Sequence, residues 1–408
     1  MNSKPVVFSK VKIVLPDSVV PGNVLIENGV IAAVNETSDV DASFPPEWEM
    51  KKPDIVDGGG DYLSPGFIDI HNHGRLGCDV MDGKSTSMDT IAKCHAGHGV
   101  TSFLAGTSSI PWEKSLEAIR FIAGYCKEET ERAASSAGEG VPCKGARCLG
   151  IYSEGNFFSM EKRGAHNPKY LKTALEKEDL DALLEAAGEA LKVVALSPEL
   201  PGAEEWIKAL KSRGVVVSAA HSNATYDETM AGIKLGVTLS THTFNGMRGL
   251  THQDPGILGA VLDDSRVCCE LIADGIHLKP VILSLVHKLK GPDRVILISD
   301  SVIAGGLPDG CYEKGGYTVF VKDGVIRLEN GTLSGSSLSL DKAVYNMVSL
   351  AGVSLPHAVR AASLNPARVL GLDGTKGSIE PGKDADLVLF DENIQIRKVF
   401  LSGVPFFE

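Results

Sequence analysis

Short apolar runs, each followed by a stretch of helical periodicity, recur over residues 64–365, and this alternation is what most limits the folds open to the chain. Amphipathic stretches such as Leu180–Leu191 and Ala203–Arg213 separate the runs. Strand and helix that alternate over about 300 residues are typical of a parallel α/β domain, and a closed (β/α)8 barrel has that size. We therefore expect a (β/α)8 barrel over residues 64–365. The runs that predict its strands include 148–152, 193–196, 215–219, 237–240, 267–273 and 295–299.

The two ends of the chain have a different pattern. Residues 5–35 and 385–390 alternate apolar and polar side chains between turn signals, as short β-strands do. Two β-rich segments that flank a long α/β middle predict one small domain built from both. We expect a β-sandwich formed by residues 1–63 and 366–408. Within the middle, the polar run 128–139 is rich in Ala, Ser and Gly and predicts an exposed loop.

Residues of metal-ligand type follow the predicted strands at the point where each strand ends. His71 and His73 stand two apart, and because side chains alternate along a strand, both imidazoles face the same way. Barrel enzymes carry their chemistry at these strand ends. Several His, Asp and Glu ligands with room for water are typical of a catalytic metal site. The sequence therefore predicts a catalytic metal centre, whose other residues are Glu154, His221, His242 and Asp300.

Charge and cysteine content limit the partners and the compartment. The formal net charge of −12 argues against non-specific binding to nucleic acid. Residues 1–15 lack a basic segment that leads into an apolar run, and no apolar stretch is long enough to span a bilayer, so we expect neither a signal peptide nor a membrane partner. The eight cysteines form no CxxC pair, and their scatter suits reduced thiols. These features predict a cytoplasmic enzyme that acts on a small molecule.

A long motif and several shorter ones are the most specific features of the sequence. The long one is EGNFFSMEKRGAHNP at 154–168, and the tail GKDADLV at 382–388 is less specific. With these motifs the chain resembles, nearly end to end, the N-acetylglucosamine-6-phosphate deacetylases of the amidohydrolase superfamily. The shorter motifs are AHS at 220–222, HTFNGM at 242–247, IADGIH at 272–277 and LISD at 297–300.

The resemblance implies an activity and a metal. The activity is hydrolysis of a linear amide C–N bond, which converts N-acetylglucosamine 6-phosphate to glucosamine 6-phosphate and acetate in amino sugar catabolism. The metal would be zinc or iron, one or two ions per subunit. Glu154, His221 and His242 would hold the main metal, and His71 and His73 would support a second one.

The resemblance also implies the residues around the substrate. Asp300 would be the general base and acid. The sugar or its phosphate would contact His166, Asn245, Gly246 and His277.

Members of the family are homodimers, and we expect the same here.

The chain departs from the family in the stretch that precedes residues 255–256. Members usually carry there an Arg that reaches across the dimer and helps to clamp the phosphate. This chain has Gln253, preceded by His252, and an uncharged amide cannot replace a guanidinium. Arg248 is a nearby cation that could substitute, so Arg248, His252 and Gln253 complete the substrate-binding candidates. A second departure is Asn156, where members usually have Pro.

Two alternatives stay open at this point. One is a related amidohydrolase that deacetylates another N-acyl amino sugar, such as galactosamine 6-phosphate or an unphosphorylated sugar, or an N-acyl amino acid. The other is a barrel that has lost catalysis and serves as a binding or assembly protein. Such proteins normally lose metal ligands, and this chain retains the whole predicted set.

Overall fold

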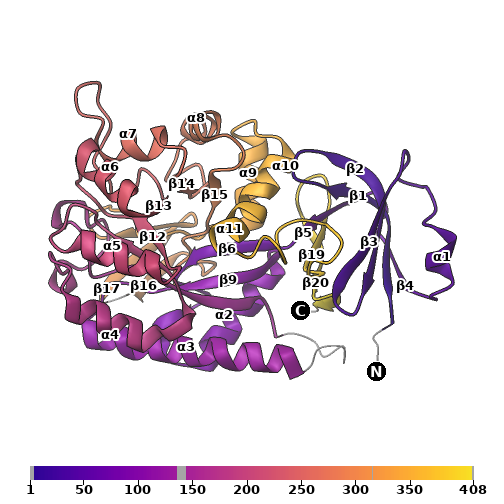
Figure 1. Ribbon diagram of the computed structural model, residues 1–408, viewed down its shortest axis with the longest axis horizontal. Helices are drawn as coiled ribbons and strands as arrows, with labels where there is room; N and C mark the ends of the chain where they lie inside the picture. Colours follow the sequence, from indigo (N-terminus) through magenta and orange to yellow (C-terminus); the bar gives the residue numbers. More distant parts are fainter. Residues whose placement is uncertain (1–3, 136–143, 315, 407–408) are drawn as a thin grey trace.

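The largest element of the protein is a curled sheet of eight parallel strands (Figure 1). The computed structural model describes residues 4–135, 144–314 and 316–406. The predicted parallel α/β architecture is confirmed. In chain order the strands are β6 (Phe67–Asn72), β9 (Val100–Gly106), β10 (Arg147–Ser153), β11 (Leu191–Leu196), β12 (Val216–Ala219), β13 (Val237–Ser240), β14 (Cys268–Leu271) and β15 (Val295–Leu297).

The strands of this sheet lie in the order of the chain, so each pairs with the strand before and after it, and β6 and β15 stand at the two ends. Hydrogen bonds also join the residues that follow β15 to the end of β6. The amide of Asp300 donates to the carbonyl of His71 at 2.9 Å, and the amide of His73 donates to the carbonyl of Ser301 at 2.7 Å. The first and last segments of the sheet are therefore in contact where the polar residues begin.

Helices connect successive strands and surround the sheet (Figure 1). In α5, for example, the buried side chains of Trp206, Ile207 and Leu210 recur at helical spacing and face the core. The helices between the strands are α2 (Ser85–Gly97), α3 (Trp112–Ser135), α4 (Lys177–Ala187), α5 (Ala203–Ser212), α6 (Tyr226–Leu235), α7 (Gly256–Asp263) and α8 (Pro280–Lys290), and α9 (Leu340–Ser349), α10 (Leu355–Ala362) and α11 (Leu364–Val369) follow β15.

The loop expected at 128–139 is wrong for its first part, because α3 continues to Ser135. Residues 128–135 are mostly Glu, Ala and Arg, which have high helix propensity. The polar residues 128–132 are exposed or half-exposed, so their polarity marks a solvated face rather than the end of the helix. The remaining residues of that expected loop lie outside the described ranges.

A second, mixed sheet combines strands from both ends of the chain. β5 pairs antiparallel with β19, so that Leu63 lies opposite Leu389. Side chains of the strands in this sheet, among them Phe8, Leu387 and Phe400, form an apolar cluster separate from the main core. All its strands belong to one hydrogen-bonded sheet, and its division into the two layers of a sandwich stays a prediction. The strands are β1 (Val6–Val14), β2 (Val19–Glu27), β3 (Val30–Glu36), β4 (Asp54–Asp57), β5 (Tyr62–Pro65), β19 (Leu387–Phe390), β20 (Ile396–Leu401) and β21 (Val404–Phe406), with the short helix α1 (Pro46–Glu49) between β3 and β4.

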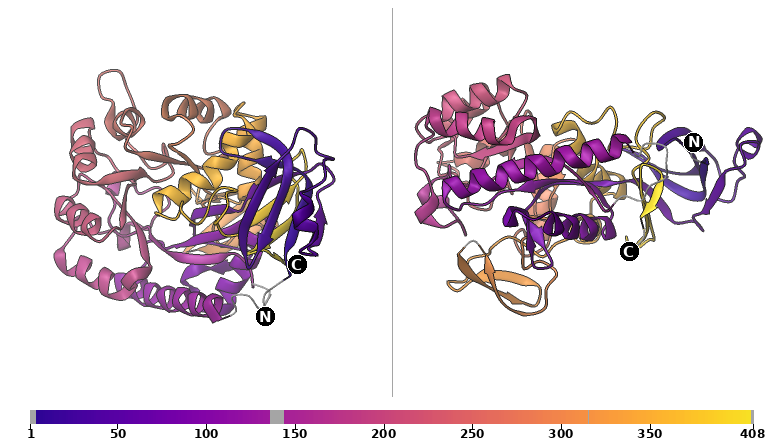
Figure 2. Two further views of the ribbon diagram at one scale, coloured as in Figure 1. Left: turned by 45° about the vertical axis from the view of Figure 1, so that its right-hand side comes forward. Right: turned by 90° about the horizontal axis from the view of Figure 1, so that it is seen from below.

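A three-stranded antiparallel sheet follows β15 and was not expected from the sequence. It consists of β16 (Gly310–Lys314), β17 (Tyr317–Lys322) and β18 (Val325–Leu328). Figure 2 shows this sheet, in orange, projecting from the body of the molecule. Asp323 and Gly324, both with positive φ, form the two-residue turn between β17 and β18.

The structure bears on two expectations from the sequence, the absence of a membrane span and the reduced state of the cysteines. No helix within the described ranges is long and apolar enough to cross a bilayer. The seven cysteines in those ranges are free, although the sulfur atoms of Cys126 and Cys148 lie 3.3 Å apart. Cys143 lies outside the described residues.

Candidate metal centre

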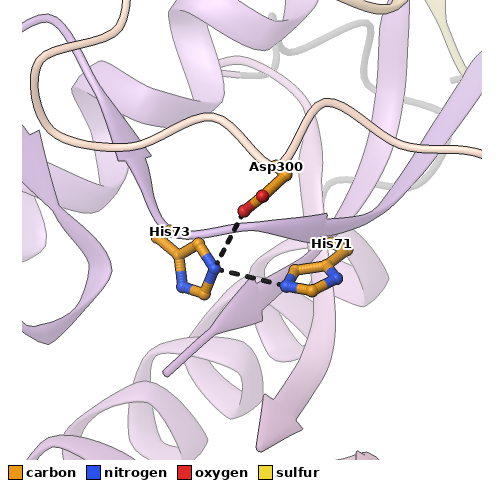
Figure 3. A group of neighbouring side chains, drawn as sticks. All are labelled: His71, His73 and Asp300. Atoms are coloured by element: carbon orange, nitrogen blue, oxygen red, sulfur yellow. Dashed lines mark hydrogen bonds and ion pairs between the residues drawn. The ribbon is translucent and has the colours of Figure 1, made fainter. Parts of the chain in front are cut away.

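His71, His73 and Asp300 form one group of candidate ligands (Figure 3). The two histidines project from the end of β6, and Asp300 comes from the loop after β15. The Nε2 atoms of His71 and His73 are 3.2 Å apart, and Nε2 of His73 lies 3.3 Å from Oδ1 of Asp300. All three residues are buried. Side chains from the first and last strands of the eight-stranded sheet therefore converge on one point.

Glu154, His221 and His242 form a second group. They follow β10, β12 and β13, and all three are buried. Nε2 of His242 lies 3.0 Å from Oε1 of Glu154 and 3.1 Å from Nε2 of His221. Within each group the potential ligand atoms all lie within 4.8 Å of one another, which is close enough for a single cation to bind among them.

The carboxylate of Glu154 belongs to both groups by geometry. Its Oε1 faces His242, while its Oε2 lies 3.3 Å from Nε2 of His73. Oε1 is also 3.7 Å from Nε2 of His71. One carboxylate can therefore contact two cations at once.

The backbone turns sharply at three of these residues. His221, His242 and Asp300 have φ values of 43°, 28° and 46°, in the left-handed region that residues other than glycine seldom adopt. His221 and His242 lie two residues after the ends of β12 and β13, and Asp300 lies three residues after the end of β15. Backbone strain of this kind persists where the surrounding structure holds it, and it is concentrated at functional sites.

Backbone carbonyls and one carboxylate orient the imidazole rings from behind. Nδ1 of His73 lies 2.9 Å from the carbonyl oxygen of Gly106, and Nδ1 of His221 lies 2.9 Å from that of Lys162. When Nδ1 carries the proton, Nε2 is left as a lone-pair donor that faces the group. The third such partner is Glu270, whose Oε2 lies 3.1 Å from Nδ1 of His71.

Glu270 is a functional candidate that the sequence analysis missed. It is fully buried in β14, and its Oε2 also accepts a hydrogen bond of 3.1 Å from the backbone amide of His242. The signal was present in the sequence, since Glu270 is the single charged residue in the apolar run 267–273. A buried carboxylate in such a strand needs a partner, and here the partner is a candidate ligand.

The electrostatics of the centre favour positive charge between its carboxylates. Burial alone would raise the pKa of Glu154, but His71, His221 and His242 hold this pKa well below its usual range. Burial also opposes ionisation of Asp300, and His73 and His71 keep its pKa low nonetheless. Burial alone would lower the pKa of His73, but hydrogen bonds to Asp300 and Glu154 raise it to about 9. The field that holds a proton on His73 would hold a divalent cation in its place.

The donor set fits a catalytic divalent metal. Imidazole nitrogen together with carboxylate oxygen suits zinc, iron and several other transition metals. The oriented imidazoles meet a further requirement of such sites, since metal-binding histidines usually have a hydrogen-bonded second nitrogen. The structure thus supports a metal centre.

A cavity of about 610 Å³ opens onto both groups of ligands. That volume is typical of small-molecule sites. His277 is one of its lining residues, and Nδ1 of His277 lies 2.6 Å from Asp274, which leaves Nε2 available. The other substrate candidates that line the cavity are His166, Asn245 and Gly246.

Arg248, His252 and Gln253 do not line this cavity. Arg248 is paired with Asp254, with Nε 2.8 Å from Oδ2. His252 and Gln253 are exposed on the same loop. Within the described chain these three candidates are therefore kept apart from the other substrate candidates.

Comparison with known proteins identifies relatives along nearly the whole chain. Residues 62–405 match the model of the amidohydrolase family. An N-acetylgalactosamine-6-phosphate deacetylase of Escherichia coli O157:H7 is 40% identical over 86% of this chain and 89% of its own length. An N-acetylglucosamine-6-phosphate deacetylase of Vibrio furnissii is 36% identical over 92% of this chain and 88% of its own. A Mycobacterium smegmatis structure of a mutant N-acetylglucosamine-6-phosphate deacetylase, in complex with N-acetylglucosamine 6-phosphate, has a TM-score of 0.85 and 29% identity, and covers 98% of both chains.

Proposed function

The chain belongs to the amidohydrolase family, and we propose that it deacetylates N-acetylglucosamine 6-phosphate, releasing acetate and glucosamine 6-phosphate. The reaction is hydrolysis of a linear amide bond and belongs to amino sugar catabolism. The observation that carries the proposal is the position of Glu154, whose carboxylate touches both groups of ligands in a cavity suited to a small molecule. The Mycobacterium smegmatis relative, which binds this sugar phosphate, supports the choice of substrate.

The cofactor in this proposal is zinc or iron, one or two ions per subunit. Glu154, His221 and His242 would hold one ion, and His71 and His73, which lie beside Asp300, would hold a second. When bound, such a cation lowers the pKa of water from 15.7 to about 7 and polarises the amide carbonyl.

Asp300 moves the proton in the proposed mechanism. Its low pKa leaves the carboxylate ionised at neutral pH, so it can accept the proton of the attacking water. The same oxygen can then return that proton to the departing amine. Oδ1 of Asp300 lies 3.3 Å from Nε2 of His73, so the proton acceptor adjoins the proposed metal ligands.

His166 and His277 are proposed to bind the sugar and the acetyl oxygen. Burial and the neighbouring His221 lower the pKa of His166 well below its usual value, so its ring is neutral and can donate one hydrogen bond. Asp274 orients His277. Asn245 and Gly246, on the loop after β13, line the same cavity and would contact the rest of the sugar.

We propose a homodimer in which the loop of Arg248, His252 and Gln253 approaches the cavity of the partner. The support is that this loop is partly exposed and lies away from its own cavity. Cytoplasmic location is proposed on the free cysteines of the described ranges, which suit a reducing compartment.

The architecture is proposed as a closed (β/α)8 barrel, residues 64–365, with a small domain of residues 1–63 and 366–408. The hydrogen bonds of Asp300 and His73 to the opposite edge of the sheet support closure. The antiparallel pairing of β5 with β19 supports a small domain made from both ends.

N-acetylgalactosamine 6-phosphate is the second candidate substrate. It differs only in the orientation of the hydroxyl at C4, and a relative with 40% identity carries that activity in its name. The metal centre would perform the same chemistry on either sugar, so the choice depends on contacts around C4.

The test is release of free amine by metal-loaded enzyme from both hexosamine phosphates, from unphosphorylated N-acetylglucosamine and from an N-acetylated amino acid. We expect the highest kcat/KM on N-acetylglucosamine 6-phosphate. Asp300→Asn should lower kcat by about 10²- to 10⁴-fold, whereas the exposed Asp263→Asn should not. Higher kcat/KM on the galactosamine compound would select the second candidate. Metal-loaded enzyme that releases amine from no phosphorylated sugar would refute both.

A further inference from the structure

The three-stranded sheet of β16, β17 and β18 forms part of the wall of the catalytic cavity. Although it projects from the body of the molecule (Figure 2), Lys314, Tyr317 and Arg327 from this sheet line the cavity together with Asp300 and Glu154. The loop that follows β18 joins the sheet to the metal centre, because the amide of Ser334 donates to the carbonyl of Ile326 in β18 at 3.1 Å and the amide of Ser336 donates to the carbonyl of Asp300 at 2.8 Å. A side chain on β16 therefore has a defined position relative to the reacting groups.

Two of the described lining residues have a basic side chain, Lys314 and Arg327. Arg327 is exposed and its Nη1 donates to the carbonyl of Gly331 at 2.8 Å, in the loop that follows β18. Lys314 is half-buried at the last position of β16. Of the two, Lys314 is the cation placed inside the cavity rather than at its rim.

The ammonium group of Lys314 has few partners for a group with three protons. Its Nζ donates to Oγ of the buried Ser334 at 3.3 Å. Within the described ranges no carboxylate forms an ion pair with Nζ. Burial lowers the pKa of Lys314, and the more distant Asp300, Asp79 and Glu154 offset this only in part. A partly desolvated cation without a contacting counter-ion is suited to bind an anionic ligand.

We propose that Lys314 binds the phosphate group of the substrate, so that each chain carries a phosphate contact of its own on the β16–β18 sheet. The inference rests on the proposed function and extends it, since it assigns a specificity-determining residue that does not belong to the candidates at the ends of the parallel strands. A hexose with its acetamido group at the metal centre extends its C6 substituent away from that centre. The charges of Asp300 and Glu154 act on Lys314, but neither carboxylate contacts its ammonium group. A sugar ring could span the space between Lys314 and these two carboxylates.

Arg248 does not supply this charge within the same chain. Its guanidinium is engaged by Asp254 and by the carbonyl of Asn223, and it lies outside the cavity wall. The only other charged groups that β16 to β18 place in the wall are Arg327 and the exposed Glu313. Lys314 is therefore the residue of this sheet whose removal tests the inference.

The experiment compares wild type, Lys314→Met, Lys314→Arg and a control, Lys322→Met, on phosphorylated and unphosphorylated N-acetylglucosamine. Methionine keeps the length of the aliphatic stem, and Lys322 is an exposed lysine of β17 that does not line the cavity. With Lys314→Met we expect kcat/KM on the phosphorylated sugar to fall about 10- to 100-fold, mainly through KM, because a charged hydrogen bond is lost. The value on the unphosphorylated sugar should stay within about twofold, Lys314→Arg should recover part of the loss, and the control should match wild type.

Binding of inorganic phosphate, measured by calorimetry and as competitive inhibition, gives a readout that does not need turnover. Lys314→Met should weaken it by a similar factor. An equal loss on both sugars would overturn the inference and assign Lys314 to the sugar or acetyl group. Unchanged phosphate binding would overturn it in favour of a phosphate contact from the partner subunit. If wild type turns over no phosphorylated sugar, the proposed function fails, and the phosphate titration still decides the role of Lys314.

Discussion

Oε2 of Glu270 lies 3.1 Å from Nδ1 of His71. The same oxygen accepts from the backbone amide of His242, so that one buried carboxylate contacts both groups of candidate ligands. It orients the ring of a ligand in one group and the backbone of a ligand in the other. Glu270 therefore couples the geometry of the two groups without itself facing the cavity.

We predict that Glu270→Gln lowers metal affinity about 10- to 100-fold, as loss of an outer hydrogen-bond partner of a ligating histidine typically does. The amide keeps the shape but removes the charge that favours a cation near His71. Competition titration against a chelating dye measures the change. Glu185→Gln, on the exposed face of α4, is the matched control. Wild-type affinity in Glu270→Gln would show that the carboxylate has no part in metal binding.

Metal stoichiometry should separate the two groups. Wild type is expected to bind two zinc ions per chain, His73→Gln to lose one of them, and His242→Gln to lose the other. Elemental analysis of dialysed protein gives the counts. Removal of all metal by a chelator should abolish activity and lower the free energy of unfolding by about 4 kcal/mol for each ion lost, relative to protein with free metal at 1,000 times Kd. A His73→Gln protein that keeps the wild-type count would reduce the centre to one ion.

Gly246→Ala should damage the group of Glu154, His221 and His242. Gly246 has φ of 62°, and an added Cβ would lie 2.5 Å from Nδ1 of His221, whose ring is held by the carbonyl of Lys162. We expect a loss of about 1–3 kcal/mol in stability from backbone strain, together with reduced metal content. Thermal unfolding and elemental analysis check both. Gly249→Ala, three residues on and with nothing within 4 Å of its Cβ, should behave as wild type.

The ion pair of His98 and Asp341 predicts a pH-dependent stability that is independent of the metal. Nδ1 of His98, after α2, lies 3.2 Å from Oδ2 of Asp341 in α9. The hydrogen bond to Asp341 raises the pKa of His98 from 6.5 to about 9. Burial opposes ionisation of Asp341, and His98 nevertheless lowers the pKa of this carboxyl. Because the pKa of His98 is raised in the folded protein, the contribution of His98 to the free energy of unfolding is full below pH 6.5 and is lost as the pH rises through about 9. Because the pKa of Asp341 is lowered in the folded protein, the contribution of Asp341 to the free energy of unfolding is full above pH 3.8. It is lost as the pH falls through the lower pKa that Asp341 has in the folded protein.

His98→Gln should therefore unfold more easily than wild type at pH 6, by roughly 0.5–1 kcal/mol because the pair is partly exposed, and should match wild type at pH 10. Denaturant titration at the two values measures this difference. A double-mutant cycle with Asp341→Asn should show coupling at pH 6 only. A difference between His98→Gln and wild type that is equal at both pH values would contradict the prediction.

Much of the eight-stranded sheet could be predicted from sequence because buried parallel strands are short, continuous apolar runs. The strand expected at 237–240 coincides with β13, and the others agree to within a few residues. The strand-end rule also explains why the six metal-site candidates could be singled out, and the structure brings them together in two adjoining groups. Their roles stay predictions.

What was missed has local physical causes. The sheet of β16 to β18 is half-exposed, so its strands are not continuous apolar runs like those of the eight-stranded sheet, although Asp323-Gly324 is a hairpin signal. Glu270 is a lone charge in an apolar run, and only the fold places it behind His71. The positions of Arg248 and Gln253 relative to the cavity depend on how the loop after β13 packs, which no local pattern encodes.

The antiparallel pairing of β5 with β19 has a consequence for how the chain is made. Pro65 and its partner Leu387 are separated by roughly 320 residues, so a ribosome that adds about 5–20 residues per second needs on the order of 16–64 s to supply the second strand. Over that interval the edge of β5 has no strand to pair with, while the residues of the eight-stranded sheet emerge in order and can pair in order. The nascent protein should therefore complete its catalytic half first and bury the edge of its smaller half last.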